Sequence, residues 1–586
     1  MKSKRKGISM LDYKLEDGSI VDGTGKPQYK GSVGIKDGVI VSLGECDQPA
    51  RETVNCSGRI IAPGFVDVHT HYDAQVFWDP TLSPSCYHGV TTVFAGFCGF
   101  SIAPLSEDAA NYLLPMLARV EGMPEGCLKE GVSWDWTTTE SYLAKLDGKV
   151  GLNAGFMAGH SAIRRVIMGE RAVGEAATDE ELAKMKALLA ESLQAGAMGF
   201  STTTSPTHND ADGNPVPSRF ATRVELLELA SVCRDYEGTT LELLPNLNFD
   251  DETIKLLTDF SLAGNRPVNW NVLAIMSADE ESREQAAKQL AVTNYARERG
   301  AEVVALAAPQ MMTIRINLYN GVIFDSLPDW TWLFKISVQE RMEKLRSPEV
   351  RAQLAEGAKK PSFLSRVANW ENMKIVETFS DETRPYQNHT VGEIADQRGT
   401  SPFDTMIDIA LIDGLKTSFM PTNKGDDRES YEIRAAICQD DRTVVGASDA
   451  GAHLDMIDSF AYSTMLLENS CRKYDLMSFE EAIHQLTEVP ARLMGLRRRG
   501  SLAVGNFADV VVLDPAEIAC GDIYTRFDLP GVKDEGRLYM DAKGINYVFV
   551  NGEMIVDNGT HTGKLPGKVL RSGQDTYTVV SMATEK

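Results

Sequence analysis

The sequence has no long apolar run and few cysteines for its length. None of its 586 residues belongs to a stretch approaching the roughly 20 apolar residues that a membrane-spanning helix needs. The first residues, MKSKRKGISMLDYKLEDGS, are basic but lack the apolar segment of a secretory signal. The 9 cysteines are odd in number and widely spread, unlike a disulfide framework. We therefore predict a cytoplasmic protein with reduced thiols.

Positive charge is also scarce. Lysine and arginine total 59 against 83 for aspartate and glutamate, which gives a formal net charge of −24. Such an acidic balance repels phosphate backbones and anionic lipid, which argues against nucleic acid and membrane as partners. With 43% hydrophobic and 24% charged residues, the composition is that of an ordinary globular protein. We expect a small-molecule substrate, and a homo-oligomer is possible.

Both ends of the chain are rich in short segments of β type. Near the start, SIVDGTGKPQ and GSVGIKDGVIVSLG alternate apolar and polar residues around Asp-Gly and Gly-Lys pairs. Near the end, GSLAVGNFADVVVLDP and INYVFVNGEMIVDNG follow the same style, with an Asn-Gly hairpin signal. We predict a small β-sandwich domain built from residues 1–64 and 491–586.

The middle of the chain, residues 65–490, alternates apolar runs with helical patterns. The runs suit strands that are buried on both faces, and they read GFVDVHTH, VTTVFAGFCG, GLNAGFMAGH, GAMGFSTT, TTLELLP, PVNWNVLA, AEVVALAAP and TVVGASDAG. A helical pattern such as TDEELAKMKALLAESLQAG opens with a capping-box sequence. This alternation predicts an α/β fold, a TIM-like (β/α)8 barrel, with an insertion at about 320–400.

His69 and His71 follow the apolar segment IIAPGFVDV. Two residues apart on a strand, their imidazoles share one face and can hold one metal ion through neutral nitrogens. Barrel enzymes carry their chemistry where such strands end. A His-x-His pair also occurs at strand ends without function, but the preceding Pro-Gly-Phe-x-Asp favours a metal site here.

Asp449 lies where the apolar strand in VVGASDAGAH stops. A carboxylate there can bind a metal ion, accept a proton from a water and return it to a leaving nitrogen. The alternative is a helix N-cap, because Ser448 and Asp449 are both good capping residues. With a His-x-His pair upstream, we assign Asp449 the catalytic role and a place among the metal ligands.

A series of motifs resembles one enzyme superfamily. In chain order they read PGFVDVHTHYD, GVTTVFAGFCGFSIAP, GHSAIRRVIMG, GAMGFSTT, GASDAGAH and RRRGSLAVGNFADVVVLDP. This order resembles the amidohydrolase superfamily, and its N-acyl-D-amino-acid deacylase (D-aminoacylase) branch in particular, over most of residues 10–560. The resemblance implies a zinc-bearing barrel flanked by a small β-sandwich.

The resemblance also implies roles for individual residues. His69 and His71 match the first-strand metal ligands, and Asp449 matches the last-strand aspartate that shuttles a proton. Cys98, in FCGFSIAP, matches a second-strand cysteine that ligates or bridges zinc. Without the resemblance, a lone cysteine is more often a small buried residue, because a thiolate needs a cation nearby.

Two strand ends depart from the pattern of that branch, whose members carry histidines at the ends of the fifth and sixth strands. No histidine lies between His208 and His389. A carboxylate in so apolar a run as TTLELLP is costly to bury unless it is paired or binds a cation, so Glu242 is either a replacement ligand or the partner of an arginine. Asn269 and Asn271 share one strand face and line the site. No lysine stands at a strand end, so the carboxylated-lysine bridge of hydantoinase-like relatives is not expected either. With fewer ligands, we expect one zinc ion rather than two.

Other residues are assigned to the substrate or left open. His160 ends the third strand in a Gly-His motif and is predicted to line the site. His453 either faces the substrate or caps a helix. Trp332, in the insertion, either forms an apolar wall over the site or packs the insertion down. His208 and His389 stand in polar loops and are expected to be exposed.

These features predict a metal-dependent hydrolase that cleaves a non-peptide C–N bond, of amide type, in a small molecule. Two alternatives come from other classes: a non-catalytic barrel with a binding role, and a metal-assisted lyase or decarboxylase. Hydrolysis of an ester or lactone would use the same residues.

Overall fold

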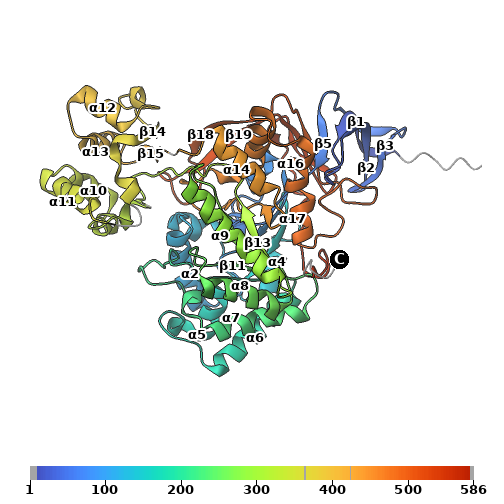
Figure 1. The fold of residues 1–586 in the computed structure, drawn as a ribbon, viewed down its shortest axis with the longest axis horizontal. Coiled ribbons are helices and arrows are strands. Elements are labelled where there is room, and N and C mark those ends of the chain that lie inside the picture. The colour runs from blue at the N-terminus through green and yellow to red at the C-terminus, as the bar shows by residue number, and fades with distance from the viewer. Residues whose placement is uncertain (1–9, 322, 362–364, 423, 581–586) are drawn as a thin grey trace, which may run out of the picture.

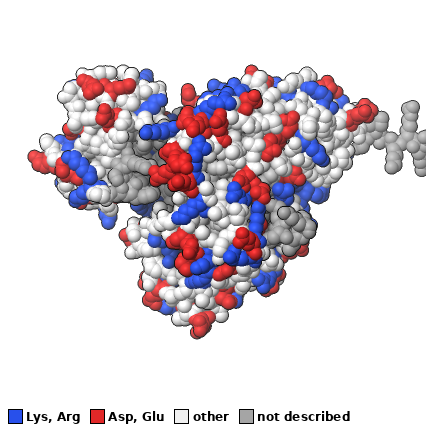
Figure 2. All heavy atoms as spheres, viewed as in Figure 1, with Lys and Arg blue, Asp and Glu red and all other residues white. Residues whose placement is uncertain are grey.

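The structure is a computed structural model that describes residues 10–321, 323–361, 365–422 and 424–580. Figure 1 shows a main body and, coloured yellow, a lobe that stands apart from it. On the face drawn in Figure 2, acidic and basic side chains are interspersed. Within the described ranges, no helix is long and apolar enough to cross a membrane.

Strands from both chain ends form one nine-stranded sheet. Its order is β22-β21-β20-β17-β5-β1-β2-β3, with β4 beside β1. β17 pairs directly with β5, so C-terminal strands continue the N-terminal part of the sheet. The strands are β1 (Leu11–Ile20), β2 (Tyr29–Lys36), β3 (Val39–Gly44), β4 (Ala50–Asn55), β5 (Ile60–Pro63), β17 (Val510–Leu513), β20 (Ile545–Val550), β21 (Glu553–Asp557) and β22 (Thr560–His561).

The alternation of apolar residues explains this sheet. In β1, Leu11, Tyr13 and Leu15 are buried while the residues between them are partly exposed, which is the period of a strand with one covered face. The ring of Tyr13 meets that of Phe549 on β20 edge-on, with centroids 5.1 Å apart. The apolar core of the sheet therefore contains residues from both chain ends.

The middle of the chain forms two sheets whose strand pairings are all parallel. One has the order β6-β7-β8 and the other β16-β13-β12-β11-β10-β9. Their residues are almost all buried, as continuous apolar runs predict. The strands are β6 (Phe65–Asp67), β7 (Val90–Ala95), β8 (Asn153–Phe156), β9 (Ala158–Gly159), β10 (Gly199–Thr203), β11 (Thr240–Leu244), β12 (Val268–Leu273), β13 (Val303–Ala307) and β16 (Thr443–Val445).

Helices follow most of these strands. α6 begins with the predicted capping box, because Thr178 and Glu181 each accept a backbone hydrogen bond from the other with their side chains. The helices of the body are α1 (Tyr72–Gln75), α2 (Glu107–Val120), α3 (Glu125–Gly131), α4 (Thr139–Leu146), α5 (His160–Met168), α6 (Asp179–Gln194), α7 (Arg223–Val232), α8 (Asp251–Gly264), α9 (Glu280–Arg297), α14 (Arg428–Cys438), α15 (Tyr462–Leu466), α16 (Phe479–Leu486) and α17 (Glu488–Leu493).

The yellow lobe of Figure 1 follows β13 and has an apolar core of its own. In that core Trp330 stacks on Trp370 with ring centroids 5.8 Å apart. β14 pairs with β15, and Ile316 bridges to Phe419, so the packed segment extends beyond the predicted limit of 400. The elements of the lobe are α10 (Val338–Leu345), α11 (Pro348–Ala358), β14 (Met373–Glu377), α12 (Val391–Arg398), α13 (Pro402–Ile412) and β15 (Ser418–Pro421).

A separate antiparallel hairpin joins the body to the lobe. The Arg537 guanidinium lies 2.8 Å from the Asp79 carboxylate, and both are largely buried. Glu377 of the lobe accepts hydrogen bonds from the N–H and the hydroxyl of Thr525. Removing one partner of a buried ion pair is strongly destabilising, so these contacts fix the hairpin in place. Its strands are β18 (Ala519–Arg526) and β19 (Arg537–Lys543).

The shared sheet core gives a first prediction. Phe549→Ala should lower the free energy of unfolding by about 3–5 kcal/mol, the usual cost of emptying a buried phenylalanine site, because the ring packs against the N-terminal strand β1. Chemical denaturation measures the change. Val504→Ala, at a side chain 64% exposed, should have almost no effect. Equal stability of the Phe549 variant and the parent would contradict a common core.

Candidate metal centre

His69 and His71 lie just beyond the end of β6 and are buried. The residue between them fixes their direction: the N–H and the hydroxyl of Thr70 both donate to the Phe94 carbonyl of β7, at 2.9 and 2.7 Å. The next N–H, that of His71, donates to the Ala450 carbonyl at 2.8 Å. Both imidazoles are thereby held on one side of the strand, with ring centroids 5.3 Å apart.

Cys98 completes a compact group with these two histidines. It follows β7 in a loop where its backbone has φ 55°, and its Sγ lies 3.7 Å from His69 Nε2. One nitrogen of each histidine and this sulfur all lie within 4.8 Å of one another. The three residues predicted as metal ligands from the first two strands are thus brought together.

Asp449 approaches the same point from the end of β16. Its Oδ1 lies 3.2 Å from His69 Nε2 and 3.5 Å from His71 Nε2. Burial opposes a negative charge here, but the two imidazoles outweigh it and hold the pKa of Asp449 well below its usual range. The neighbouring Ser448 donates to Asp67 at 2.5 Å, which anchors the loop that carries Asp449.

Glu242 and Asn271 reach the cluster from β11 and β12. Glu242 is fully buried and accepts a hydrogen bond from the Cys98 N–H at 3.0 Å. Burial raises the pKa of Glu242 well above its ordinary value. Asn271 Nδ2 lies 3.3 Å from His69 Nε2. Asn269 is placed differently, because its amide donates to the Leu241 carbonyl within the sheet.

The donor set fits a divalent cation. His69 Nδ1, Glu242 Oε1 and Asn271 Oδ1 are buried without a hydrogen-bond partner in the part of the chain that the structure describes. Such orphaned atoms are rare in folded proteins, and a cation would satisfy the oxygens. Imidazole, thiolate and carboxylate are the ligands that zinc takes.

Comparison with known proteins decides the family. The model of the amidohydrolase family matches residues 52–556. The chain belongs to the amidohydrolase family. Among curated proteins, this amidohydrolase is 30% identical to an uncharacterised protein of Mycobacterium tuberculosis, over 86% of this chain and 85% of the relative.

Two further matches agree with the resemblance to D-aminoacylases. A D-aminoacylase of Alcaligenes xylosoxydans xylosoxydans is 27% identical, with 96% of this chain and 97% of the relative covered. A solved D-aminoacylase structure covers 96% of this chain and 100% of its own, at 23% identity and a TM-score of 0.63. That likeness shows that the amidohydrolase shares the fold.

Glu121 is part of the centre in this amidohydrolase, and sequence reasoning missed it. Its Oε1 lies 3.6 Å from His71 Nδ1. Burial lowers the pKa of His71, but the charges of Glu121 and Asp449 outweigh burial and raise it to about 9. Glu121 follows a helix rather than a strand, so no strand-end signal marked it.

His208 and His453 also lie near the centre. The Nδ1 of each is buried and has no hydrogen-bond partner among the described residues. Burial lowers the pKa of His208 to about 3 and that of His453 to about 4, and the charges of His71 and Asp449 act on both. The expectation of an exposed His208 is therefore wrong. His389 is exposed, as expected, beside Glu393.

Two residues predicted to bind substrate lie elsewhere. His160 is buried with its Nδ1 2.9 Å from the Thr202 hydroxyl and its Nε2 2.9 Å from Glu225, so no ring nitrogen is left for a substrate. Trp332 packs on the apolar core of the lobe. The placement of Trp332 is the second of its two predicted alternatives, whereas the partners of His160, Thr202 and Glu225, come from segments distant in the sequence.

The metal ligands give the second prediction. His71→Ala should weaken metal binding by more than the roughly 10–100-fold that loss of a supporting hydrogen bond causes, because a donor atom itself is removed. Metal per protein, measured by mass spectrometry after dialysis, checks it. The control is His389→Ala, which should keep the parental metal content. Full metal content in the His71 variant would contradict the assignment.

The position of His160 gives the third prediction. His160→Ala should lower the free energy of unfolding by about 1–3 kcal/mol, because the buried Glu225 loses one hydrogen bond and keeps its ion pair with Arg164. KM should stay within about twofold of the parental value, since such a group binds no substrate. Denaturation and steady-state kinetics measure the two effects. A large rise in KM with unchanged stability would restore the substrate-binding role.

Proposed function

We propose that this amidohydrolase cleaves an amide-type, non-peptide C–N bond of a small molecule. The observation that carries the proposal is the meeting of Asp449 with the His69–His71–Cys98 group, at 3.2–3.5 Å from the imidazole nitrogens. The D-aminoacylase, N-acyl-D-aspartate deacylase and N-acyl-D-glutamate deacylase relatives are named for amide hydrolysis. Their names support an N-acylated amine as the substrate class.

We propose zinc as the metal, held by His69, His71 and Cys98, with Asp449 as a further ligand. One ion is favoured over two, because β11 and β12 offer Glu242 and asparagines rather than histidines. Glu242 is the residue that would complete the donor set, since its Oε1 is buried and unpartnered among the described residues. A solved N-acyl-D-glutamate deacylase of Bordetella bronchiseptica was crystallised with zinc.

The chain's own groups account for the proton transfers. When bound, the metal would polarise the scissile carbonyl and lower the pKa of a water. Asp449 accepts one proton of the attacking water at its carboxylate and then donates it to the leaving nitrogen, so that one amide and one water give a carboxylic acid and an amine. His453 is neutral, with a pKa of about 4, and can hydrogen-bond the substrate without adding charge. Asn271, on β12, orients the substrate.

The same proposal includes the architecture that places these groups. The two parallel sheets would be halves of one closed (β/α)8 barrel: β8 and β9 are one residue apart in the chain, and Thr70 bridges in parallel to Ala450. Residues 65–490 would form this barrel with its lobe, and residues 1–64 and 491–586 the β domain.

We place the enzyme in the cytoplasm, because all nine cysteines are free.

The proton shuttle gives the fourth prediction. Asp449→Asn should lower kcat by at least about 10²-fold, the contribution of a general base, and keep most of the metal because three ligands remain. A screen of N-acyl amino acids of both hands and of aryl amides supplies the substrate. Asp475→Asn, at an exposed position, is the control. An unchanged rate across pH would assign the role to another residue.

A further inference from the structure

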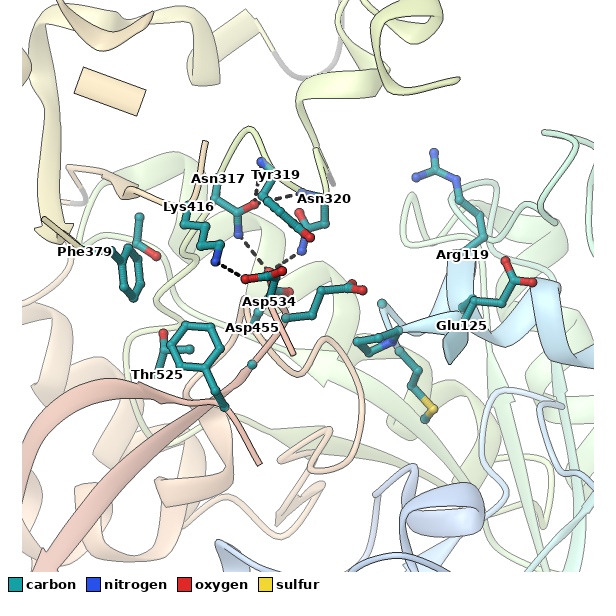
Figure 3. Close-up of a pocket in the computed structure, with 18 residues that line it drawn as sticks. Arg119, Glu125, Asn317, Tyr319, Asn320, Phe379, Lys416, Asp455, Thr525 and Asp534 are labelled. Carbon is teal, nitrogen blue, oxygen red and sulfur yellow. Dashed lines mark hydrogen bonds and ion pairs between the residues drawn. The ribbon is translucent and has the colours of Figure 1, made fainter. Parts of the chain in front are cut away.

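A cavity of about 220 Å³ lies beside the metal centre, between four parts of the chain. They are the turn between α2 and α3, the lobe, the connection between β18 and β19, and the loop after β16 that carries Asp455. Figure 3 shows Lys416, Asp455 and Asp534 close together, with Arg119 and Glu125 at the other side of the cavity. The residues that the argument uses are Gly122, Tyr319, Lys416, Asp455, Phe527 and Glu535.

The cavity borders the centre through two short links. Gly122 lines it and directly follows Glu121, whose carboxylate faces His71. A methyl group added at Gly122 would lie 3.2 Å from His453 Nδ1, so the backbone passes tightly against that ring. On the opposite wall, Asp455 follows His453 by two residues. A molecule whose reacting group lies at the centre could therefore extend into the cavity.

The charges in the cavity are unbalanced. Four carboxylates line it (Asp455, Asp534, Glu535 and Glu125), against two cations, Lys416 and Arg119. Both cations are already paired: Lys416 lies 2.6 Å from Asp534, and Arg119 lies 2.6 Å from Asp325 outside the cavity lining.

Asp455 and Glu535 are left without a cation. Asp455 is held by the side-chain amides of Asn317 and Asn320, which supply no charge. Glu535 is half-buried, and burial together with the charges of Asp455 and Asp534 raises its pKa. In the described part of the chain no cation acts on it. Like charges this near disfavour each other's ionised form, and a positive group placed between Asp455 and Glu535 would relieve that repulsion.

The aromatic walls suit the same kind of group. The Lys416 ammonium lies 5.8 Å from the ring centroid of Tyr319 and 5.7 Å from that of Phe527. Cations over aromatic faces at such distances are attracted by the ring electrons. The cavity thus already holds one alkylammonium group of the protein itself, on two rings and one carboxylate. Phe379 extends this aromatic wall, with its ring centroid 5.8 Å from that of Phe527, and the carboxylates of Asp455 and Glu535 also line the cavity.

We propose that this cavity is a specificity subsite for a cationic side group of the substrate, an alkylammonium on an aliphatic stem, with Glu535 and Asp455 as its counter-ions. The inference rests on the proposed amide hydrolysis and adds the substrate class: an N-acyl compound that carries an amine several bonds from the scissile bond. A carboxylate in the same place would meet two uncompensated acids, and Lys416, the ammonium that lines the cavity, is paired with Asp534.

The test compares two substrates that differ by one charge. N-acetyl-lysine and N-acetyl-norleucine, each of both hands, have stems of similar length, and only the first ends in an ammonium. The parent should hydrolyse the lysine compound with a kcat/KM at least about tenfold higher, the effect of one charged hydrogen bond. Glu535→Gln should remove most of that preference, because the lysine ammonium loses one of its two counter-ions.

A control variant separates this subsite from general acidity. Glu125 lines the same cavity but is already paired with Lys129, so Glu125→Gln should keep the preference. Equal rates on both compounds, or a higher rate on N-acetyl-glutamate, would overturn the proposal and point to Lys416 as an anion receptor. So would a loss of preference in the Glu125 variant equal to that in the Glu535 variant.

A binding experiment tests the subsite independently of amide hydrolysis. Calorimetric titration with pentylammonium chloride needs no turnover. The parent should bind it at least about tenfold more tightly than the Glu535→Gln variant. Binding of this kind without hydrolysis of any N-acyl compound would refute the proposed function and leave the subsite standing. Hydrolysis of N-acetyl-norleucine without pentylammonium binding by the parent would refute the subsite and leave the proposed function standing.

Discussion

The burial of acidic groups around two histidines is the constraint on which the rest of the centre depends. Burial raises the pKa of Asp67, Asp73 and Glu121 to about 7 in each case, because a carboxylate loses its hydration without a compensating positive charge. His71 supplies part of that charge, with a pKa of about 9. The arrangement is costly for the fold unless positive charge is gathered at this point, and a divalent cation is the most compact way to supply it.

Backbone hydrogen bonds keep this arrangement fixed. Thr70 is tied to β7 through its N–H and its hydroxyl, and the N–H of Asp449 donates to the His69 carbonyl at 3.2 Å. The first and last parallel strands therefore hold their ligands against each other before any side-chain contact is considered. Groups carried on strand ends of this kind need little reorganisation when a substrate binds, which is what preorganised catalysis requires.

The sequence predicted the parts of the site that follow apolar strands. His69, His71 and Asp449 each stand where a buried run stops, so a local pattern pointed to them, whereas Cys98 was assigned through the resemblance to D-aminoacylases. Glu121 follows a helix, and His208 stands in a loop whose burial depends on packing against Phe100, with ring centroids 4.9 Å apart. Such burial is decided by segments far apart in the sequence. The insertion was predicted at about 320–400, but its last strand, Ser418–Pro421, returns only after residue 400, and that return depends on pairing with a distant segment.

The hairpin β18–β19 and the lobe line the cavity beside the centre, and the residues proposed as metal ligands lie in other segments. They are joined to each other through Glu377 and Thr525, and to the body through Arg537 and Asp79. Substitutions among the cavity-lining residues of these segments, away from those contacts, can alter substrate binding while the reaction chemistry is preserved. These two segments, and not the proposed ligand set, are therefore the part to compare when a substrate is transferred from one relative to another.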